Sequence, residues 1–563
     1  MIYHCEDHTC NYWDEGEKLP ERCPQCGRKL LRANEADMTG DDWTALGNTL
    51  WDAEASDKKR MVDCFRKAAY LGSAWGVCNL GICMEQGNGV EADPVQAFWL
   101  YQQAVEMGSL NAVCCLGVCY QYGIGTAPDA EKAAELYCKA AEYGSPRGQM
   151  LLARAFHDGI GVEADAAEAV HWVRAAAYQR YGEGMYRLGV CYEYGDGVEQ
   201  NWEHAVHWFR EAAESGVSVA MTDLGYCYEK GCGVEQSWEQ AFSWYRRGAE
   251  CGYPVSMSNL GLCYKRGYGV EQNWQEAIKW YEQGAQCGDL QCMHNLACCY
   301  ERGEGVEQNE DRALYWYRRG AEAGSDYCMY CLGWNYSNGE GVEQNMTEAI
   351  RWYTAAAEGG NADAMHDLGW HYDHGEGVEQ DMKKAICWYE RAAEQNHPAA
   401  MNSLGECYAM GRGVPRDLET AMEWYRRAAE LGEAMADYNM GWHLEQAGKL
   451  SEAYAHYRKA ADGNDDSAWW ALGRFYENGV VVAQDGKEAR RCYETGEKLG
   501  SVKCKMRLAR CKLLGIGGRR AKKAGLDLCR QALELAKESS EKEDYGYEAE
   551  MNLLRRTIAE NES

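Results

Sequence analysis

The residues best suited to metal chemistry stand at the start of the chain. Two pairs of cysteines, Cys5 with Cys10 and Cys23 with Cys26, are separated by a dozen residues. Four thiolates at such spacing can form a tetrahedron around zinc, and the run CPQCG of the second pair suits a tight turn. Because four protein ligands leave no open position for a substrate, we expect this zinc to be structural.

The first cysteine pair is less typical of a zinc site than the second. Four residues stand between Cys5 and Cys10, whereas the usual gap is two, and His8 leaves that usual gap after Cys5. His8 is therefore an alternative ligand to Cys10. The alternative without metal is a redox-active dithiol or a set of unbound thiols. Residues 1–35 have too little core to fold alone, so bound zinc is the better explanation, and the segment resembles a zinc ribbon.

The rest of the chain carries no arrangement of residues that is typical of catalysis. It has no GxxxxGK phosphate loop, no HExxH metal pair and no GxSxG nucleophile turn. Its many Gly-x-Gly units are followed by Val-Glu and are explained by a repeat instead. We therefore expect no enzymatic activity.

A period of 36 residues organises the chain beyond the cysteine cluster. A Leu-Gly pair recurs, and we call its leucine the anchor of each unit. From Leu80 to Met440 every step between anchors is 36 residues, which predicts a repeat architecture. The anchors are Leu46, Leu80, Leu116, Leu152, Leu188, Leu224, Leu260, Leu296, Leu332, Leu368, Leu404, Met440, Leu472 and Leu508.

Each unit is expected to fold into two helices. Around Leu224 the apolar residues recur at the three-and-four spacing of one helical face, which predicts a first helix, helix A. Gly231 is expected to end helix A, and Ser237 is expected to start helix B through a capping box. Gly252 then ends helix B. The glycine directly after the anchor, here Gly225, is expected to let the two helices approach closely.

The unit pattern AMxxLGxCYExGxGVEQNxxEAIxWYxxAAExG resembles the Sel-one-like repeat family, which is related to the tetratricopeptide repeats. The resemblance covers about residues 41–535. It implies a right-handed α/α superhelix that serves as an adaptor or scaffold for other proteins. Some members are linked to penicillin binding and carry disulfide-paired cysteines separated by seven residues in each repeat. Here the nearest approach, Cys287 and Cys292, has four residues between and is not repeated.

We therefore predict an all-α protein, a superhelical solenoid of about fourteen two-helix repeats preceded by a small zinc ribbon. The ribbon spans residues 1–35, the solenoid 41–536, and a C-terminal capping helix and tail 537–563. One helix pair cannot bury its apolar face alone, so stability must come from stacked neighbours. Cysteines that recur three residues after an anchor are expected to be small core residues rather than a disulfide ladder.

Charge and hydropathy narrow the classes of partner. The formal net charge of −30 disfavours nucleic acids and anionic membranes. No run of 18 apolar residues occurs, and the first residues lack the basic and apolar regions of a signal peptide. We expect a cytoplasmic protein whose partner is a protein or peptide.

The surface opposite the core of helix A is the expected binding surface. Positions one before, two after and six after each anchor face the concave side of such solenoids, and we call them the A face. Cations there would contact an acidic part of a peptide, and tryptophans would contact an apolar part. The alternative is that these side chains are solvated or pack between adjacent helices. The predicted binding residues are Tyr226, Lys230, Arg266, Arg302, Trp334, Asn338, Asp367, Trp370, His374 and Trp442.

Three functions fit these observations to different degrees. A non-catalytic scaffold that holds a partner on the A face fits best. A β-lactam-linked, hydrolase-like repeat protein would be acylated by penicillin. A zinc-ribbon regulator associated with nucleic acid would bind it in a salt-sensitive way despite the acidic charge.

Overall fold

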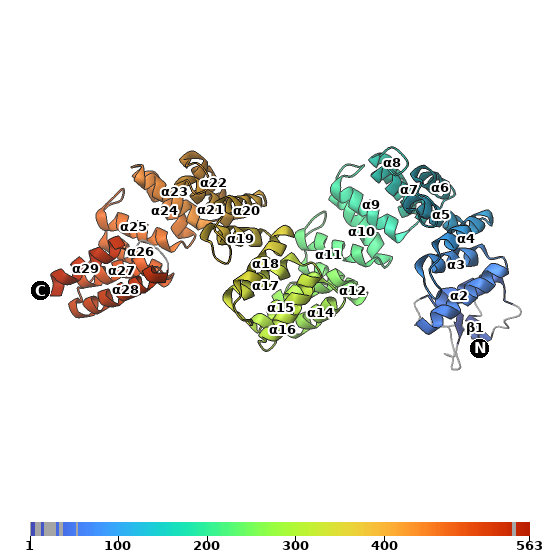
Figure 1. The fold of residues 1–563 in the computed structure, drawn as a ribbon, viewed down its shortest axis with the longest axis horizontal. Coiled ribbons are helices and arrows are strands. Elements are labelled where there is room, and N and C mark those ends of the chain that lie inside the picture. The colour runs from blue at the N-terminus through green and yellow to red at the C-terminus, as the bar shows by residue number, and fades with distance from the viewer. Residues whose placement is uncertain are drawn as a thin grey trace. The chain divides into compact units, whose positions relative to one another are not determined.

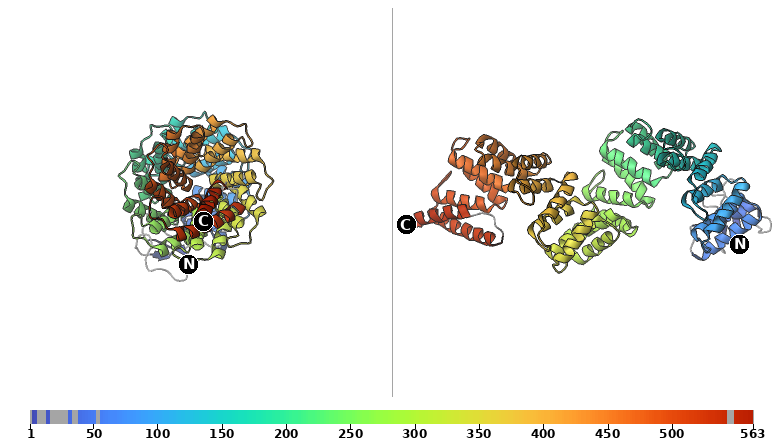
Figure 2. Two further views of the ribbon diagram at one scale, coloured as in Figure 1. Left: turned by 90° about the vertical axis from the view of Figure 1, so that its left-hand side faces the viewer. Right: turned by 45° about the horizontal axis from the view of Figure 1, so that its top comes forward.

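The computed structural model describes residues 2–5, 13–15, 30–32, 38–51, 55–542 and 548–562. In this part of the chain, 29 helices follow a small sheet. The chain divides into two compact units, Met1–Cys292 and Met293–Ser563, and each is described here by itself. Within each unit, consecutive helices lie side by side in chain order (Figure 1 and Figure 2).

The first unit opens with a three-stranded antiparallel sheet of order β2-β1-β3. Cys5 ends β1, whereas His8, Cys10, Cys23 and Cys26 lie outside the described residues. The predicted zinc ligands therefore remain a prediction. The strands are β1 (Ile2–Cys5), β2 (Trp13–Glu15) and β3 (Leu30–Arg32).

The remainder of the first unit is helical. Odd-numbered helices correspond to helix A and even-numbered ones to helix B of the predicted repeats. The helices are α1 (Gly40–Thr49), α2 (Ala55–Tyr70), α3 (Ala74–Gln86), α4 (Pro94–Glu106), α5 (Leu110–Tyr122), α6 (Ala130–Glu142), α7 (Pro146–Asp158), α8 (Ala166–Tyr178), α9 (Gly182–Tyr194), α10 (Trp202–Glu214), α11 (Ser218–Lys230), α12 (Trp238–Glu250), α13 (Pro254–Arg266) and α14 (Trp274–Gln286).

The second unit continues the same alternation. The boundary between the units falls within α15 (Leu290–Arg302). The following helices are α16 (Glu310–Glu322), α17 (Asp326–Asn338), α18 (Met346–Glu358), α19 (Ala362–His374), α20 (Met382–Glu394), α21 (Pro398–Met410), α22 (Leu418–Glu430), α23 (Ala434–Gln446), α24 (Leu450–Asp462), α25 (Asp466–Asn478), α26 (Gly486–Lys498), α27 (Val502–Leu514), α28 (Lys522–Lys542) and α29 (Glu548–Glu562).

The helix ends follow the predicted signals with one difference. Gly231 ends α11 in the left-handed conformation at φ 76°, and Gly252 follows α12 at φ 82°. The Ser237 hydroxyl accepts from the backbone N–H of Gln240, as predicted. It donates to Glu239 at 3.0 Å. The return bond of a capping box, from the Ser237 backbone N–H to the Gln240 side chain, is not formed, because this N–H donates to the Tyr228 carbonyl oxygen. Half of the predicted box therefore caps α12.

A buried tyrosine of helix B packs against the anchor glycine of helix A. Tyr245 of α12 is 1% exposed, and a Cβ atom at Gly225 would lie 2.6 Å from its ring atom Cε1. The glycine thus lets the two helices approach through this ring, which confirms the expected close approach. The Tyr245 hydroxyl donates to Glu229 at 2.9 Å, so the one polar atom of the ring is satisfied.

We call the place of this tyrosine the ring position. It normally lies 21 residues after the anchor. From α3 to α26 it holds tyrosine in ten repeats, phenylalanine in one and valine in one. The ten tyrosines are among the largest fully buried side chains of the chain: Tyr101, Tyr137, Tyr245, Tyr281, Tyr317, Tyr353, Tyr389, Tyr425, Tyr457 and Tyr493.

The cysteines three residues after the anchors lie in the core, as expected of small core residues. Cys83, Cys119 and Cys407 are buried, and burial raises the pKa of the Cys83 thiol to about 11. No disulfide joins the cysteines whose placement the structure describes. Cys287, which is exposed, and Cys292, which is buried, are both free thiols.

The last helix covers the end of the array. α29 packs against α27 and α28. Arg507 of α27 donates from Nε and Nη2 to the two carboxylate oxygens of Glu550 at 2.6 and 2.7 Å. Leu554 of α29 is 1% exposed and joins the core cluster of these helices. None of the helices in the described residues is both long and apolar enough to cross a membrane.

Candidate functional site

Three tryptophans of the predicted binding surface are exposed in the second unit. Trp334 of α17, Trp370 of α19 and Trp442 of α23 are 47%, 37% and 42% exposed. They stand at the same place of their repeats, two residues after the anchor. Each indole is therefore partly covered by the protein and partly exposed.

Polar groups accompany two of these indoles at the distance of one helical turn. The Asn338 side chain donates from Nδ2 to the carbonyl oxygen of Trp334 at 3.2 Å. The imidazole of His374 stacks on Trp370 with ring centroids 4.3 Å apart, and its Nδ1 lies 3.0 Å from the Trp370 carbonyl oxygen. Each of the two helices thus presents an indole with a polar side chain beside it.

Asp367, another predicted binding residue, links α17 to α19. Its carboxylate accepts from the Tyr330 hydroxyl at 3.1 Å and lies 3.0 Å from Nδ1 of His366. The side chain is only 26% exposed. Because its two oxygens already have partners from within the protein, Asp367 positions the helices that carry Trp334 and Trp370.

The predicted cations are divided between the two units. Lys230 and Arg266 end α11 and α13 of the first unit, whereas Arg302 ends α15 in the second. All three are exposed. The Lys230 ammonium pairs with Glu229 at 2.8 Å and lies 5.7 Å from the ring centroid of Tyr226, which is 45% exposed. The structure therefore brings Tyr226 and Lys230 together.

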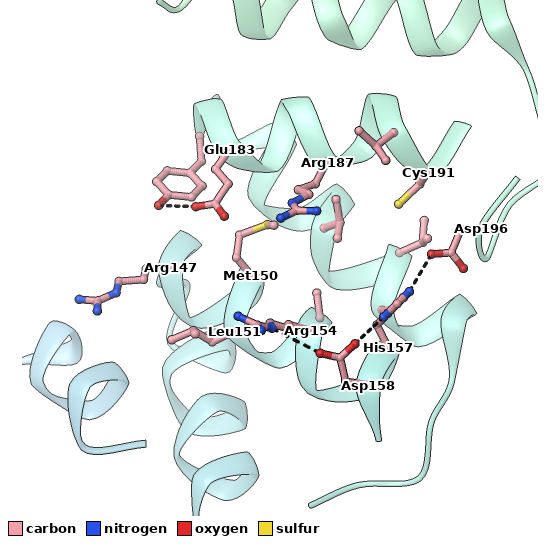
Figure 3. A pocket seen from close by; sticks show the side chains of 16 residues that line it. Arg147, Met150, Leu151, Arg154, His157, Asp158, Glu183, Arg187, Cys191 and Asp196 are labelled. Atoms are coloured by element: carbon pink, nitrogen blue, oxygen red, sulfur yellow. Dashed lines mark hydrogen bonds and ion pairs between the residues drawn. The ribbon is translucent and has the colours of Figure 1, made fainter. Parts of the chain in front are cut away.

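The first unit contains a pocket that the sequence analysis did not identify. It has a volume of about 600 Å³ and lies among α7, α8 and α9 (Figure 3). Ala169, Val170 and Val173 of α8 supply apolar lining, and Arg154 of α7 and Arg187 of α9 supply charge. Pockets of this volume are of the size that takes small ligands.

The pocket lies where the repeat departs from its own pattern. Val173 occupies the ring position that holds tyrosine or phenylalanine in the neighbouring repeats. Ala153 stands at the place of the anchor glycine, opposite a valine and not a ring. Part of the space filled by a ring elsewhere is therefore left to the pocket.

The carboxylates of the pocket already have partners. Nδ1 of His157 lies 2.7 Å from Asp158, and its Nε2 lies 3.2 Å from Asp196 (Figure 3). Hydrogen bonding to Asp158 is the main cause that raises the pKa of His157, and Asp196 adds to it. Arg154 pairs with Asp158 at 3.3 Å. The Tyr181 hydroxyl donates to Glu183 at 3.5 Å, the long limit of a hydrogen bond.

Arg187 is the cation of this pocket without such a partner. Within the described part of the chain, its guanidinium forms no hydrogen bond or ion pair, and Figure 3 draws it without a dashed line. It stands one residue before anchor Leu188, and Arg154 stands two residues after anchor Leu152. Both positions belong to the A face.

A second, smaller hollow of about 320 Å³ lies next along the first unit. Its lining includes Tyr186, Glu193, Asp223 and Tyr226, together with Phe209 at the ring position. Burial raises the pKa of both Glu193 and Asp223 from their ordinary values. Tyr226, predicted from sequence as a binding residue, is thus part of a hollow on the A face.

The sequence did contain a signal for the larger pocket. The predicted binding residues are aromatic, polar and charged side chains at exposed positions, whereas this signal lies in the core. The signal was an aromatic ring missing from the core, since Val173 stands at the ring position. Ala153 replaces the anchor glycine of the same repeat, and His157 stands where the next repeat has Glu193. Breaks in an otherwise regular core identify cavities that surface residues do not.

Capped helix pairs with a constant core and a variable outer face define a helical repeat protein. The family model of the Sel1 repeat matches twelve segments, which cover more than half of the chain, and the chain therefore belongs to the Sel1 repeat family. The matched segments are 76–109, 112–145, 146–181, 182–217, 218–253, 254–289, 290–325, 326–361, 362–397, 398–433, 434–465 and 468–501.

The match confirms the predicted family and adjusts the number of repeats. About fourteen units were expected, and the model does not match the pair α1 and α2 or the pair α27 and α28. These pairs stand at the ends of the array, where repeats are usually atypical. Sel1 repeat proteins generally act as scaffolds for protein–protein interaction and are typically not catalytic.

Solved structures with similar folds include a protective antigen of uropathogenic Escherichia coli strains that displays an SLR fold. It is 29% identical, with a TM-score of 0.52, and the match covers 89% of this chain and 94% of that one. A Sel1 repeat protein from Oxalobacter formigenes is 32% identical over 43% of this chain and 96% of its own, with a TM-score of 0.40. No curated protein matches the chain.

Proposed function

We propose that the protein is a non-catalytic scaffold whose A face binds a partner protein or peptide. The observation that carries this proposal is the set of exposed indoles at Trp334, Trp370 and Trp442, which recur at one position of the repeat. Exposed aromatic side chains that gather on one surface are typical of interaction sites, since burying them against a partner is favourable. Family membership supports the same function.

The charges of the A face suggest what kind of peptide would bind. The apolar part of the partner lies against Trp334 and Trp370, and its acidic part lies near Arg302, the predicted cation of the same unit. The net charge of −30 favours such a partner over nucleic acid or an anionic membrane. We place the protein in the cytoplasm.

The test compares two variants of the full chain. In the first, Trp334, Trp370 and Trp442 are replaced by Ala; in the second, only Trp99, which is 66% exposed on helix B of another repeat, is replaced. Partners captured from the native organism and identified by mass spectrometry should be lost from the first variant and retained by the second. Retention of every partner by the triple variant would show that the tryptophans are not the binding surface.

We also propose that Cys5, Cys10, Cys23 and Cys26 bind a structural zinc ion. The strand pairing supports this arrangement. Because β1 is antiparallel to both β2 and β3, its last residue, Cys5, lies at the edge of the sheet where β2 and β3 begin. In the sequence, Cys10 precedes β2 by three residues and Cys26 precedes β3 by four.

Metal analysis of the purified full chain tests the zinc proposal. One zinc ion per chain is expected in the wild type, and Cys23→Ser should lose it. Comparing Cys10→Ser with His8→Asn decides which of the two residues is the ligand, because only the true ligand should lower the zinc content. A wild-type protein purified under reducing conditions with zinc present and still without zinc would refute the proposal.

A further inference from the structure

We propose that the pocket among α7, α8 and α9 binds a small amphipathic anion, with its apolar body over Val173 and its carboxylate on Arg187. This site lies in the first unit, whereas Trp334, Trp370 and Trp442 lie in the second. It goes beyond the proposed scaffold function and does not depend on it.

The apolar lining comes from all three helices. Val170 and Val173 of α8 are 3% and 6% exposed, so they form a closed floor. Met150 and Leu151 of α7 and Val190 of α9 line the pocket as well. An apolar or aromatic body placed here takes the space that a tyrosine ring occupies in neighbouring repeats, and it gains the same burial of apolar surface.

The charges of the pocket select an anion over a cation. Asp158 and Asp196 are engaged by His157, and Glu183 is engaged by Tyr181. A cationic ligand would therefore have to displace existing partners. Arg187, in contrast, has no acceptor among the described residues.

A carboxylate is the group that fits Arg187 best. The planar guanidinium can donate two parallel hydrogen bonds to a carboxylate, and such charge-assisted bonds are the stronger ones. Figure 3 shows Arg187 and Arg154, from α9 and α7, beside Met150 in the pocket. Arg154 therefore adds positive potential even while it pairs with Asp158 at 3.3 Å.

Two kinds of ligand carry a carboxylate on an apolar body. One is a free aromatic or aliphatic carboxylic acid. The other is the C-terminal residue of a polypeptide, whose α-carboxylate and apolar side chain present the same two groups. The experiment distinguishes them by offering both in otherwise identical conditions.

The probes are 3-phenylpropionate and the peptide acetyl-Ala-Ala-Phe with a free C-terminus, each paired with its amide. Binding to the full chain is followed by saturation-transfer NMR and by calorimetry. A fragment of this size should bind with a Kd of about 0.1–5 mM. The amides should bind at least about tenfold more weakly, because they lose the charge-assisted bonds.

The relative affinities of the two acids identify the source. If the free-acid peptide binds at least as tightly as 3-phenylpropionate, a polypeptide C-terminus is the natural occupant. If only 3-phenylpropionate binds, the occupant is a free acid. The proposal is refuted if neither acid binds, or if acids and amides bind equally.

Two variants test the parts of the site separately. Arg187→Gln should weaken binding of the acid at least about tenfold and leave the amide unchanged. Val173→Tyr together with Ala153→Gly restores the pattern of the neighbouring repeats and should abolish binding of acid and amide alike. Arg246→Gln, at an exposed arginine of α12, is the control and should bind as the wild type does.

The exposed side chain of Arg187 keeps the test independent of folding. Circular dichroism and thermal unfolding check both variants, and if the Val173→Tyr protein fails to fold, Arg187→Gln still decides the matter. Wild-type affinity for the acid in Arg187→Gln would overturn the proposal. The Trp334, Trp370 and Trp442 variant should bind the acid normally, so failure of the scaffold proposal remains distinguishable.

Discussion

Val173 and Tyr245 occupy equivalent places in two repeats, and the difference between them separates a cavity from a packed core. A tyrosine ring fills the space between helix A and helix B, and glycine stands opposite it in nearly all repeats. The exception in the repeats from α3 to α26 is Ala297, which stands opposite Tyr317. A valine at the ring position leaves room for Ala153, so the size of one side chain and the absence of a Cβ atom are coupled in most repeats.

This coupling predicts the outcome of a double-mutant cycle. Gly225→Ala should lower the free energy of unfolding by about 1–3 kcal/mol, because the added Cβ would lie 2.6 Å from the Tyr245 ring. Tyr245→Val should cost about 2–4 kcal/mol through the cavity it creates. The double variant, which copies the natural pair Ala153 and Val173, should cost less than the two single costs added together.

Urea unfolding of the wild type, the two single variants and the double variant measures this coupling. Tyr245→Val alone serves as the control for the cavity. Costs that simply add would mean that the glycine and the ring do not constrain each other.

The imidazole of His157 predicts a pH dependence of stability. Its pKa is raised from 6.5 in the folded protein, first by the hydrogen bond to Asp158 and then by Asp196. The stabilisation is therefore fully present below about pH 6.5 and is lost as the pH rises through the raised folded value. The charged groups that contact this imidazole are Asp158 and Asp196. The other charged or titratable groups that line the pocket are Arg147, Arg154, Tyr181, Glu183, Arg187 and Cys191.

The variant His157→Asn tests this dependence. Since the imidazole is 56% exposed, the effect should be only about 0.2–1 kcal/mol. His157→Asn should be less stable than the wild type at pH 5.5 and nearly equal to it at pH 8.5, as measured by thermal unfolding at both values. A difference that grows toward high pH would contradict the assignment.

At the scale of single elements, the end of the array depends on one partly buried ion pair. Arg507 of α27 and Glu550 of α29 are 14% and 8% exposed in their side chains. Because removal of Glu550 leaves the guanidinium with fewer acceptors in a poorly solvated place, Glu550→Ala should lower the free energy of unfolding of this region by about 2–4 kcal/mol.

A matched control is available on the surface of α12. Glu250 pairs with Arg246 at 2.8 Å, but both side chains are more than half exposed. Glu250→Ala should therefore cost no more than about 0.5 kcal/mol. Hydrogen exchange of α29 reports the local effect, and equal protection of α29 in the wild type and in Glu550→Ala would refute the importance of the pair.

Most helices were predictable from the sequence because their boundaries depend on local chemistry. Gly231 and Ser237 act through their own backbone and side chain, so a 36-residue period repeats their effect in each unit. The same local signals do not determine to which acceptor a capping hydroxyl donates its hydrogen bond. Ser237 therefore donates to Glu239, although a capping box with Gln240 was expected.

The pocket was not predicted because it depends on contacts between three helices. Its signal, Val173 with Ala153, is visible only by comparison with the other repeats, and Arg187 and Arg154 are ordinary exposed residues when read alone. The exposed state of Trp334 followed from its position relative to the anchor. The engagement of Asp367 by Tyr330, which belongs to the preceding repeat, did not.

At the scale of the whole molecule, stability is distributed along the array. The substantial helix contacts in the described part of the chain join helices one or two places apart in sequence. Such proteins are stabilised by the sum of repeat and nearest-neighbour terms, and a local defect spreads only as far as neighbouring repeats feel it. The cluster of Tyr353, Tyr389 and Tyr425, for example, lies within the second unit.

The variant Tyr389→Ala tests this distribution. Loss of a ring that is 1% exposed should cost about 3–5 kcal/mol within its own region. Hydrogen exchange should therefore accelerate in α19, α20 and the helices that pack against them, which belong to the second unit. Exchange in α3 to α6 of the first unit should stay as it is in the wild type. Equal acceleration in both units would instead show that the array unfolds as one cooperative body, and the binding surfaces of the two units would then be linked in stability.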